Sequence, residues 1–464
     1  MELSSAPPSQ VKDKPKARIK GPRGFPLLGV LPGLIKNPFE YLVKTGRKYK
    51  GIVRLPVLGI NLYLVSEPED VKQILATNQR NYWKGPMLGR AKFLLGNGIA
   101  TSEGATWRNQ RRLMQPAFSH QKIANLSGDV TGRIGNMLEA WASENSGEKI
   151  LRIDQEMLRL TMEISTYTMF GESMDPETAQ NLGMAVGRLQ QHLNHRVFTF
   201  FLPEKFPLPG ARTAQKILKQ LDDLAYRLIS ERRENPRQTN DLLNILLSVT
   251  DEETGEKMDD TQLRDEIITL FVAGYDTTSM GLAWAWYLLS QHPEIEKKFH
   301  EEIDTVLQGR VPGFEDYPRL EYTRRIFQEA LRFYPPVWIF FRTNFAEDLI
   351  GESVIPENSP ILLCPYVAHR NPEFWETPEV FNPDHFLPEK IANRPKYAYF
   401  PFGGGGRQCI GEGFAYMKAI FTLAMVGQKY KLRALPEHKV VPHSAPGLQP
   451  KYGIKMKAEP RIIV

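Results

Sequence analysis

The sequence contains little cysteine: Cys364 and Cys409 are the only two among its 464 residues. They lie in different contexts, which argues against the disulfide framework of small secreted proteins and favours a reducing compartment. Cys364 ends the apolar run Ile361-Leu362-Leu363, and we expect it to be a core residue of a buried strand.

Long apolar runs are also missing. Residues 1–20 are polar and rich in Pro, Ser and Lys, with neither the apolar centre of a signal peptide nor a membrane-spanning run. No uncharged apolar stretch of about 18 residues occurs elsewhere. We therefore expect a disordered tail over residues 1–20, no transmembrane anchor and a cytoplasmic protein.

Linkers, repeats and basic runs are absent as well. The hydrophobic residues, 42% of the total, are spread evenly, so we expect one large domain over residues 21–464 rather than several. No basic run with interleaved aromatics indicates nucleic acid binding. The net charge of +6 is a modest bias that suits an acidic protein partner or an anionic surface.

The most informative stretch is residues 402–411, Phe-Gly-Gly-Gly-Gly-Arg-Gln-Cys-Ile-Gly. Four consecutive glycines disfavour helix and strand and let the backbone approach another group closely. The pattern turns helical after Cys409, which places this thiol before a helix N-terminus, where a thiolate is favoured. A thiolate is a soft ligand suited to iron or copper. The alternative is that Cys409 is a small buried hydrophobe.

Residues 260–291 form the longest helical candidate, and they contain Ala-Gly-Tyr-Asp-Thr-Thr at 273–278. Glycine inside a helix costs about 1 kcal/mol relative to alanine, and Asp and Thr side chains compete for backbone hydrogen bonds. Such sequence indicates a kink or bulge, often at a functional position. The alternative is a threonine-rich kink without further role.

Glu329 and Arg332 are spaced i,i+3 within the helical segment 327–332 and so share one face. Taken alone, such a pair is usually a surface salt bridge worth about 0–1 kcal/mol.

Three further residues carry a weaker signal. Trp107 and Arg111 are spaced i,i+4 on a helix that begins near Glu103, and Arg342 closes the apolar strand 337–342. A tryptophan and an arginine on a helix are more often core and surface residues. An arginine that ends a strand is more often a solvent-facing charge.

Together these motifs resemble the cytochrome P450 family. Residues 402–411 fit F-G-x-G-x-R-x-C-x-G, residues 273–278 fit A/G-G-x-D/E-T-T/S, and residues 329–332 fit E-x-x-R. The resemblance covers about residues 20 to 460 and implies a mainly α fold with a small β region. This fold is a single domain, a helical triangular prism around a buried haem.

The implied cofactor is haem b, iron protoporphyrin IX, with the Cys409 thiolate as axial ligand of the metal. Arginines would bind its propionates. The residues that match the cofactor site of the family are Trp107, Arg111, Ala273, Gly274, Arg342, Phe402, Gly403, Arg407, Cys409 and Gly411.

The resemblance also assigns the polar residues. Thr277 would hold oxygen and an ordered water, while Asp276 relays protons from solvent. Glu329 and Arg332 would form a buried pair that supports the cysteine loop. The third member of that network is commonly an arginine, but here the position is His385, which lacks the bidentate fork and the fixed charge.

The implied function is a haem-thiolate monooxygenase that inserts one atom of O2 into a C–H or C=C bond of an apolar small molecule. The alternatives are a peroxide-driven or isomerase-type member and a non-catalytic haem-thiolate binding or sensor protein. No redox module is fused to the domain, so we expect electrons from a ferredoxin or flavodoxin with an NAD(P)H-dependent reductase. We expect a soluble, bacterial-type monomer.

The sequence gives less direct information about the substrate. The general pattern of the chain is similar to that of bacterial fatty-acid and terpenoid or carotenoid hydroxylases. Residues 82–98 mix aromatics and glycines without periodicity, and the equivalent region lines the pocket in the family. The candidate pocket residues are Tyr82, Trp83, Phe93, Phe271, Ala273, Val337, Trp338 and Phe340.

Overall fold

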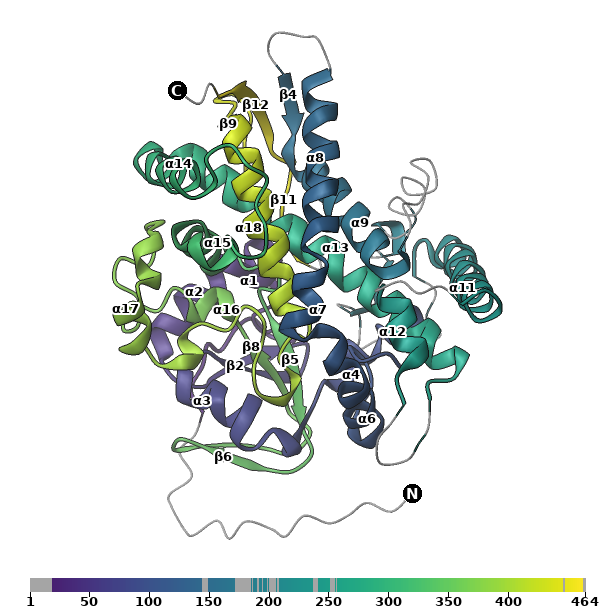
Figure 1. The fold of residues 1–464 in the computed structure, drawn as a ribbon. Coiled ribbons are helices and arrows are strands. Elements are labelled where there is room, and N and C mark those ends of the chain that lie inside the picture. The colour runs from purple at the N-terminus through teal and green to yellow at the C-terminus, as the bar shows by residue number, and fades with distance from the viewer. Residues whose placement is uncertain are drawn as a thin grey trace.

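The computed structural model describes residues 19–143, 149–171, 208–236, 241–250, 257–444 and 447–461, with single positions between 185 and 206 and residue 255. The predicted tail over residues 1–20 lies outside the described residues except for its last two positions. The described chain is mainly helical with a small β region, as expected (Figure 1).

Long helices make up most of the body. They are α2 (Pro38–Tyr49), α6 (Gly104–Met114), α8 (Ser127–Ser143), α9 (Ile153–Phe170), α11 (Ala211–Glu234), α13 (Asp260–Gln291), α14 (Pro293–Leu307), α15 (Glu321–Phe333) and α18 (Glu412–Lys429). The shorter helices are α1 (Leu31–Lys36), α3 (Pro68–Lys72), α4 (Gly85–Gly89), α5 (Lys92–Leu95), α7 (His120–Asn125), α12 (Leu242–Ser248), α16 (Pro365–Ala368) and α17 (Pro388–Ala392).

Single turns of other helix types connect them. One π-helical turn, η1 (Gln73–Thr77), extends α3. The 3₁₀ turns are η2 (Gln79–Asn81), η3 (Gln115–Phe118), η4 (Tyr317–Arg319), η5 (Pro383–Phe386), η6 (Lys396–Ala398) and η7 (Gly405–Arg407).

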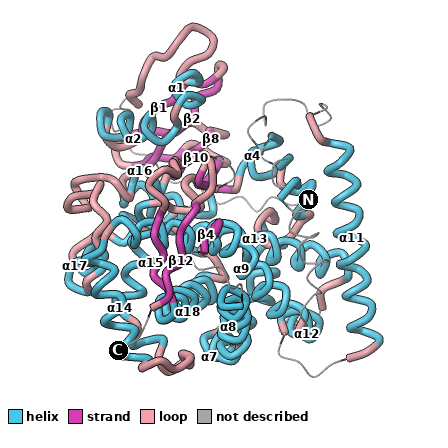
Figure 2. The backbone as a smooth tube through the Cα atoms, turned by 90° about the horizontal axis from the view of Figure 1, so that it is seen from above, coloured by secondary structure: helices cyan, strands magenta, loops and turns pink. Residues whose placement is uncertain are grey.

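The strands form small sheets beside the helices (Figure 2). The five-stranded sheet has the order β1 (Val53–Val57), β2 (Ile60–Val65), β8 (Pro360–Leu363), β5 (Phe340–Asn344) and β3 (Tyr82–Trp83). The three-stranded sheet has the order β4 (Lys149–Arg152), β12 (Lys455–Pro460) and β9 (Tyr430–Ala434). The two-stranded sheets pair β6 (Asp348–Ile350) with β7 (Ser353–Ile355) and β10 (Pro442–Ser444) with β11 (Leu448–Pro450).

β1 and β2 pair antiparallel around the turn that holds Gly59 and so form a hairpin. The prediction that Cys364 is a core residue is confirmed. Cys364 follows β8 directly and is fully buried, where its thiol donates to the carbonyl of Trp338 at 3.2 Å.

The helix α13 crosses the middle of the molecule (Figure 1) and contacts α9, α11, α15 and α18. The carboxylate of Asp259 caps it by accepting from the amide of Gln262 at 2.7 Å. Its bounds match the prediction, and all 32 residues are α-helical, so no π-bulge interrupts the helix. The hydroxyl of Thr277 turns back to donate to the carbonyl of Ala273 at 3.0 Å and leaves the helix intact.

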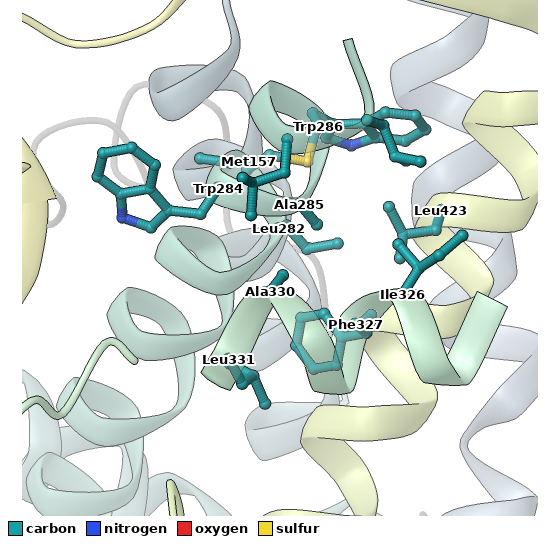
Figure 3. Close-up of a cluster of buried hydrophobic side chains, with 14 of the residues drawn as sticks. Met157, Leu282, Trp284, Ala285, Trp286, Ile326, Phe327, Ala330, Leu331 and Leu423 are labelled. Carbon is teal, nitrogen blue, oxygen red and sulfur yellow. The ribbon is translucent and has the colours of Figure 1, made fainter. Parts of the chain in front are cut away.

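The main core lies where four helices meet. Figure 3 shows side chains of this cluster, among them Met157 of α9, Leu282 of α13, Phe327 of α15 and Leu423 of α18. Gly281 allows the close approach of α13 and α15, since a Cβ there would lie 3.0 Å from the Phe327 ring. This packing fixes α13 and α18 on opposite walls of the cavity described next.

Candidate active site

A cavity of about 350 Å³ opens between α13, α18 and the loop over residues 402–411. This volume falls in the range of small-molecule and cofactor sites. Residues predicted from distant parts of the sequence meet in its lining, namely Ala273, Gly274, Thr277, Val337, Phe340, Phe402, Arg407, Cys409 and Gly411.

The cysteine loop has its shape because of glycine. Gly403 and Gly405 adopt positive φ angles of 72° and 64°, which side chains rarely tolerate. A Cβ at Gly405 would lie 1.7 Å from the carbonyl oxygen of Leu75, so only glycine fits there. The amide of Cys409 donates to the carbonyl of Phe402 at 2.9 Å and closes the loop. The loop thereby presents the thiol to the cavity, three residues before α18 begins.

The electrostatics of Cys409 differ from the expectation. The thiol faces the cavity, whose walls shield it from bulk water, and this burial raises the pKa of Cys409. The amide of Gly411 and the charges of Arg111 and Lys418 oppose the rise without cancelling it. The helix terminus therefore does not by itself offset the effect of burial on the pKa of Cys409. A bound metal cation would add the positive charge that favours deprotonation.

The opposite wall is a bare stretch of α13. Ala273, Gly274 and Thr277 line the cavity there, and their small side chains leave space between the helix and the thiol. Asp276 is 9% exposed and lies one position away, outside the lining. Of the two predicted catalytic residues, Thr277 thus lies at the surface of the cavity and Asp276 lies just behind it.

A group of buried cations lies near one end of the cavity. Arg407 lines the cavity and pairs with Glu103, and its guanidinium stacks 4.4 Å from the ring centroid of Trp107. Burial and the charge of Arg407 lower the pKa of Arg342 to about 10. The same two causes lower the pKa of Lys84 to about 7. Three cations share the site, and the carboxylate paired with Arg407 is that of Glu103.

This charge pattern fits a haem. Neighbouring cations favour an anion near them, and haem carries two carboxylates at one edge. The thiol would provide a ligand at one face of the haem, and the small residues of α13 leave room at the other face. Lys84 was not predicted from the sequence, because lysine is almost never buried and no local pattern marks this one.

Arg111 lies on the cysteine side of the site. Its guanidinium donates to the carbonyl of Gln408 at 2.8 Å, the residue before Cys409. Trp107, one turn earlier on the same helix, contacts Arg407. This hydrogen bond means that Arg111 stabilises the cysteine loop.

Several predicted pocket residues lie outside the lining of this cavity: Tyr82, Trp83, Phe93, Phe271 and Trp338. The hydroxyl of Tyr82 bonds to Asp348, and Trp338 packs edge-on against Phe39 at 5.1 Å. Trp83 stacks on Phe345, Phe93 meets the ring of His192, and Phe271 packs against Tyr275. The candidate pocket residues that do line the cavity are Ala273, Val337 and Phe340.

The predicted Glu–Arg–His network is assembled in the core. Arg332 binds Glu329 through two hydrogen bonds of 2.7 Å, and both side chains are fully buried. Arg332 also donates to the carbonyls of His369 and Pro378. Burial alone would raise the pKa of Glu329, but Arg332 and His385 outweigh it and hold that pKa below its ordinary value.

The network ties α15 to the chain that leads into the cysteine loop. The amide of Asn382 donates to Glu329 at 2.8 Å, and Nδ1 of His385 lies 3.1 Å from the same carboxylate. Removing one partner would leave a buried charge uncompensated, which costs about 3–5 kcal/mol.

Comparisons with known proteins agree with this geometry. The family model for cytochrome P450 matches residues 19–458. Cyclooctat-9-en-7-ol 5-monooxygenase of Streptomyces melanosporofaciens is 34% identical over 434 residues, which cover 93% of this chain and 92% of the relative. Pentalenene oxygenase of Streptomyces avermitilis is 31% identical over 423 residues, covering 91% and 92%.

Among solved structures, the haem domain of cytochrome P450DA matches with a TM-score of 0.87 and 26% identity. The match covers 97% of this chain and 99% of that one. None of the described helices combines the length and apolar character needed to cross a membrane.

Proposed function

The chain belongs to the cytochrome P450 family and is a monooxygenase of that family, and we propose that it inserts one atom of O2 into a terpenoid. The observation that carries this proposal is the cavity in which the Cys409 thiol faces Ala273, Gly274 and Thr277. One wall offers a soft metal ligand, and the other offers space and a hydroxyl.

The family implies a haem-thiolate cofactor, and we propose haem b with Cys409 as its axial ligand. Arg342 and Arg407, joined by Lys84, would hold its carboxylates, which remove the mutual repulsion of these cations. When bound, the haem supplies the oxygen chemistry, which an axial thiolate favours by donating electron density.

The polar residues of α13 handle protons and water. The hydroxyl hydrogen of Thr277 is donated to the carbonyl of Ala273, which leaves its oxygen free to accept from a water in the cavity. Asp276, behind it, can hold a proton on its carboxyl group and exchange it with that water. This acid–alcohol pair supports the monooxygenase over the peroxide-driven and isomerase alternatives.

The substrate class rests on the cavity and on the relatives. Apart from Lys122, Arg407, Lys418 and a few hydroxyl groups, the lining is apolar, with Leu242, Ile245, Leu270, Val337 and Phe340 among its members. An apolar cavity binds an apolar molecule by removing its surface from water. The two relatives named above oxidise terpenoid skeletons, which supports a terpenoid over a fatty acid.

The electrons come from a separate redox protein in this proposal. A ferredoxin or flavodoxin with an NAD(P)H-dependent reductase would supply them. The net charge of +6 suits an acidic partner of this kind.

A substrate screen tests the proposal. The purified holoprotein is titrated with a panel of cyclic terpenes and terpene alcohols, with fatty acids of similar size as the comparison, and the haem spin-state change is recorded. We expect a terpene to give the larger change and, with a ferredoxin system, a product that carries one added oxygen atom. Binding without substrate-dependent oxygen consumption would instead indicate a sensor.

A further inference from the structure

A buried lysine of α18 contacts α13 beside Asp276 and Thr277, and this stretch of α13 is called its oxygen side below. Lys418 of α18 is 1% exposed and lines the cavity. Its Nζ donates to the carbonyl of Gly274 at 2.7 Å, and it lies 4.8 Å from the ring centroid of Phe414. Within the described residues, the bond to Gly274 is the hydrogen bond that holds this ammonium.

Gly274 contributes its backbone to this contact. A Cβ at this position would have the hydroxyl of Ser165 as its neighbour, at 3.4 Å. The Ser165 hydroxyl is buried and has no partner within the described residues. Lys418 instead contacts the carbonyl oxygen of Gly274.

The bond belongs to a series. Four successive carbonyls of α13 each accept from a side-chain donor: Ala273 from Thr277, Gly274 from Lys418, Tyr275 from Thr161 and Asp276 from Ser279. Thr277 and Ser279 act within the helix, whereas Thr161 lies on α9 and Lys418 on α18. The segment that carries the proposed catalytic pair is thus held from two sides.

The burial of Lys418 has a desolvation cost, because its amino group is removed from water and makes one hydrogen bond within the described residues. A methionine of similar length would fill the same volume without that cost. The bond to Gly274 is therefore the feature that distinguishes lysine from an apolar side chain at this position.

We propose that Lys418 is a positioning residue that links the helix following the cysteine ligand to the oxygen side of α13. Its bond to Gly274 fixes the spacing between Cys409 and the backbone that carries Asp276 and Thr277. This inference rests on the proposed monooxygenase function, because the spacing matters only if both walls act on one bound molecule. The link acts through the backbone of α13.

The test compares four forms of the full-length holoprotein. Lys418→Met removes the donor at nearly constant volume, and Lys418→Gln keeps an N–H donor. The matched control is Thr422→Val, one turn further along α18, where a buried hydroxyl bonds only to the carbonyl of Lys418 at 2.7 Å. The readouts are thermal stability, amide exchange over residues 270–280 and the fraction of electrons recovered in product.

We expect Lys418→Met to match or exceed the wild-type melting temperature and to exchange about fivefold faster over residues 274–279, as loss of one hydrogen bond allows. The product fraction should fall several-fold with little change in KM. Lys418→Gln should give exchange rates and product fractions between those of the wild type and Lys418→Met. Thr422→Val should behave as the wild type in both measurements.

A lower melting temperature with unchanged exchange and product fraction would overturn the inference, because Lys418 would then act only in folding. If Lys418→Met fails to retain haem, Lys418→Gln decides between the same outcomes. Failure of the proposed function is distinguishable, since the wild type would then show no substrate-dependent oxygen use. Unchanged exchange in both Lys418 variants would overturn the inference independently.

Discussion

Nδ1 of His385 lies 3.1 Å from Oε1 of Glu329, and its Nε2 faces the carbonyl oxygen of Glu376. Both partners are hydrogen-bond acceptors, so each ring nitrogen faces an oxygen atom. The imidazole therefore occupies the position where the family commonly has an arginine. His385 and Arg332 approach the carboxylate of Glu329 together.

Replacement of His385 tests this contact. We expect His385→Arg to retain haem, because a guanidinium also offers hydrogen-bond donors to Glu329. His385→Leu should lose about 2 kcal/mol of unfolding free energy and release haem faster, since the buried carboxylate of Glu329 loses a hydrogen-bond partner. Haem content and thermal unfolding measure both effects. Loss of haem in His385→Arg would show that the position requires the smaller ring.

Cys409→Ser tests the axial ligand. The ferrous carbon monoxide complex of the wild type should show a strongly red-shifted Soret band, and the variant should lose that shift because an alcohol does not replace a thiolate donor. Cys364→Ser is the control, since its buried side chain can still donate to the carbonyl of Trp338. An unshifted band in the wild type would contradict thiolate ligation.

Thr277→Ala removes the hydroxyl on the oxygen side. We expect the fraction of electrons recovered in product to fall by on the order of tenfold, because water in the cavity loses the hydroxyl oxygen that accepts its hydrogen bond. Oxygen consumption and haem binding should persist. Thr166→Val serves as the control, since its buried hydroxyl bonds within α9 and lies outside the cavity lining. Equal product fractions in both variants would favour the peroxide-driven alternative.

Lys84→Met tests the cation group. The ammonium of Lys84 is buried near Arg407 and Arg342, and we expect its loss to speed haem dissociation about tenfold by removing one charged partner of a carboxylate. Transfer of haem to an acceptor protein measures the rate. Lys72→Met, which removes a half-exposed lysine paired with Glu69, is the control. The assignment of Lys84 to the haem fails if both variants release haem at the wild-type rate.

Glu266→Gln should change the pH dependence of stability. Glu266 of α13 is fully buried and accepts from the amide of Ile99 at 2.9 Å, while Oε1 has no partner within the described residues. Burial raises its pKa to about 8, above the ordinary glutamate value near 4.5. The folded state therefore holds a proton that the unfolded chain releases, and stability falls as pH rises through this window.

The variant cannot release that proton. Between about pH 5 and about pH 8, we expect the unfolding free energy of the wild type to fall by on the order of 3 kcal/mol. Glu266→Gln should not show this decrease. Chemical unfolding at several pH values measures the difference. Glu301→Gln, at an exposed position, should follow the wild type. Parallel curves for all three proteins would mean that Glu266 is ionised in the folded state.

The sequence was informative where chemistry imposes a local pattern. The glycines around Cys409 and the Asp–Thr step on α13 are unusual within their segments, so they could be recognised without a structure. The Glu329–Arg332 spacing also sufficed to predict a shared helix face. The bounds of α13 followed from a long run with few helix breakers and match the structure.

Burial could not be predicted in the same way, because it depends on partners far along the chain. The sequence places lysines on the surface, yet Lys84 and Lys418 are buried. Aromatic side chains suit a pocket and a core equally well, and Tyr82 lies against Asp348 while Trp338 lies against Phe39. These assignments depend on tertiary contacts that no local pattern records.

The pairing of β12 with β4 has a consequence for biosynthesis. β4 leads into α9, but its sheet partner lies at residues 455–460, after the cysteine loop. A ribosome releases the chain from its N-terminus onward, so α9 and α13 emerge before either the cofactor ligand or the closing strand exists. Haem can therefore be captured only after residues 402–460 have been made, which makes cofactor loading a step that follows translation.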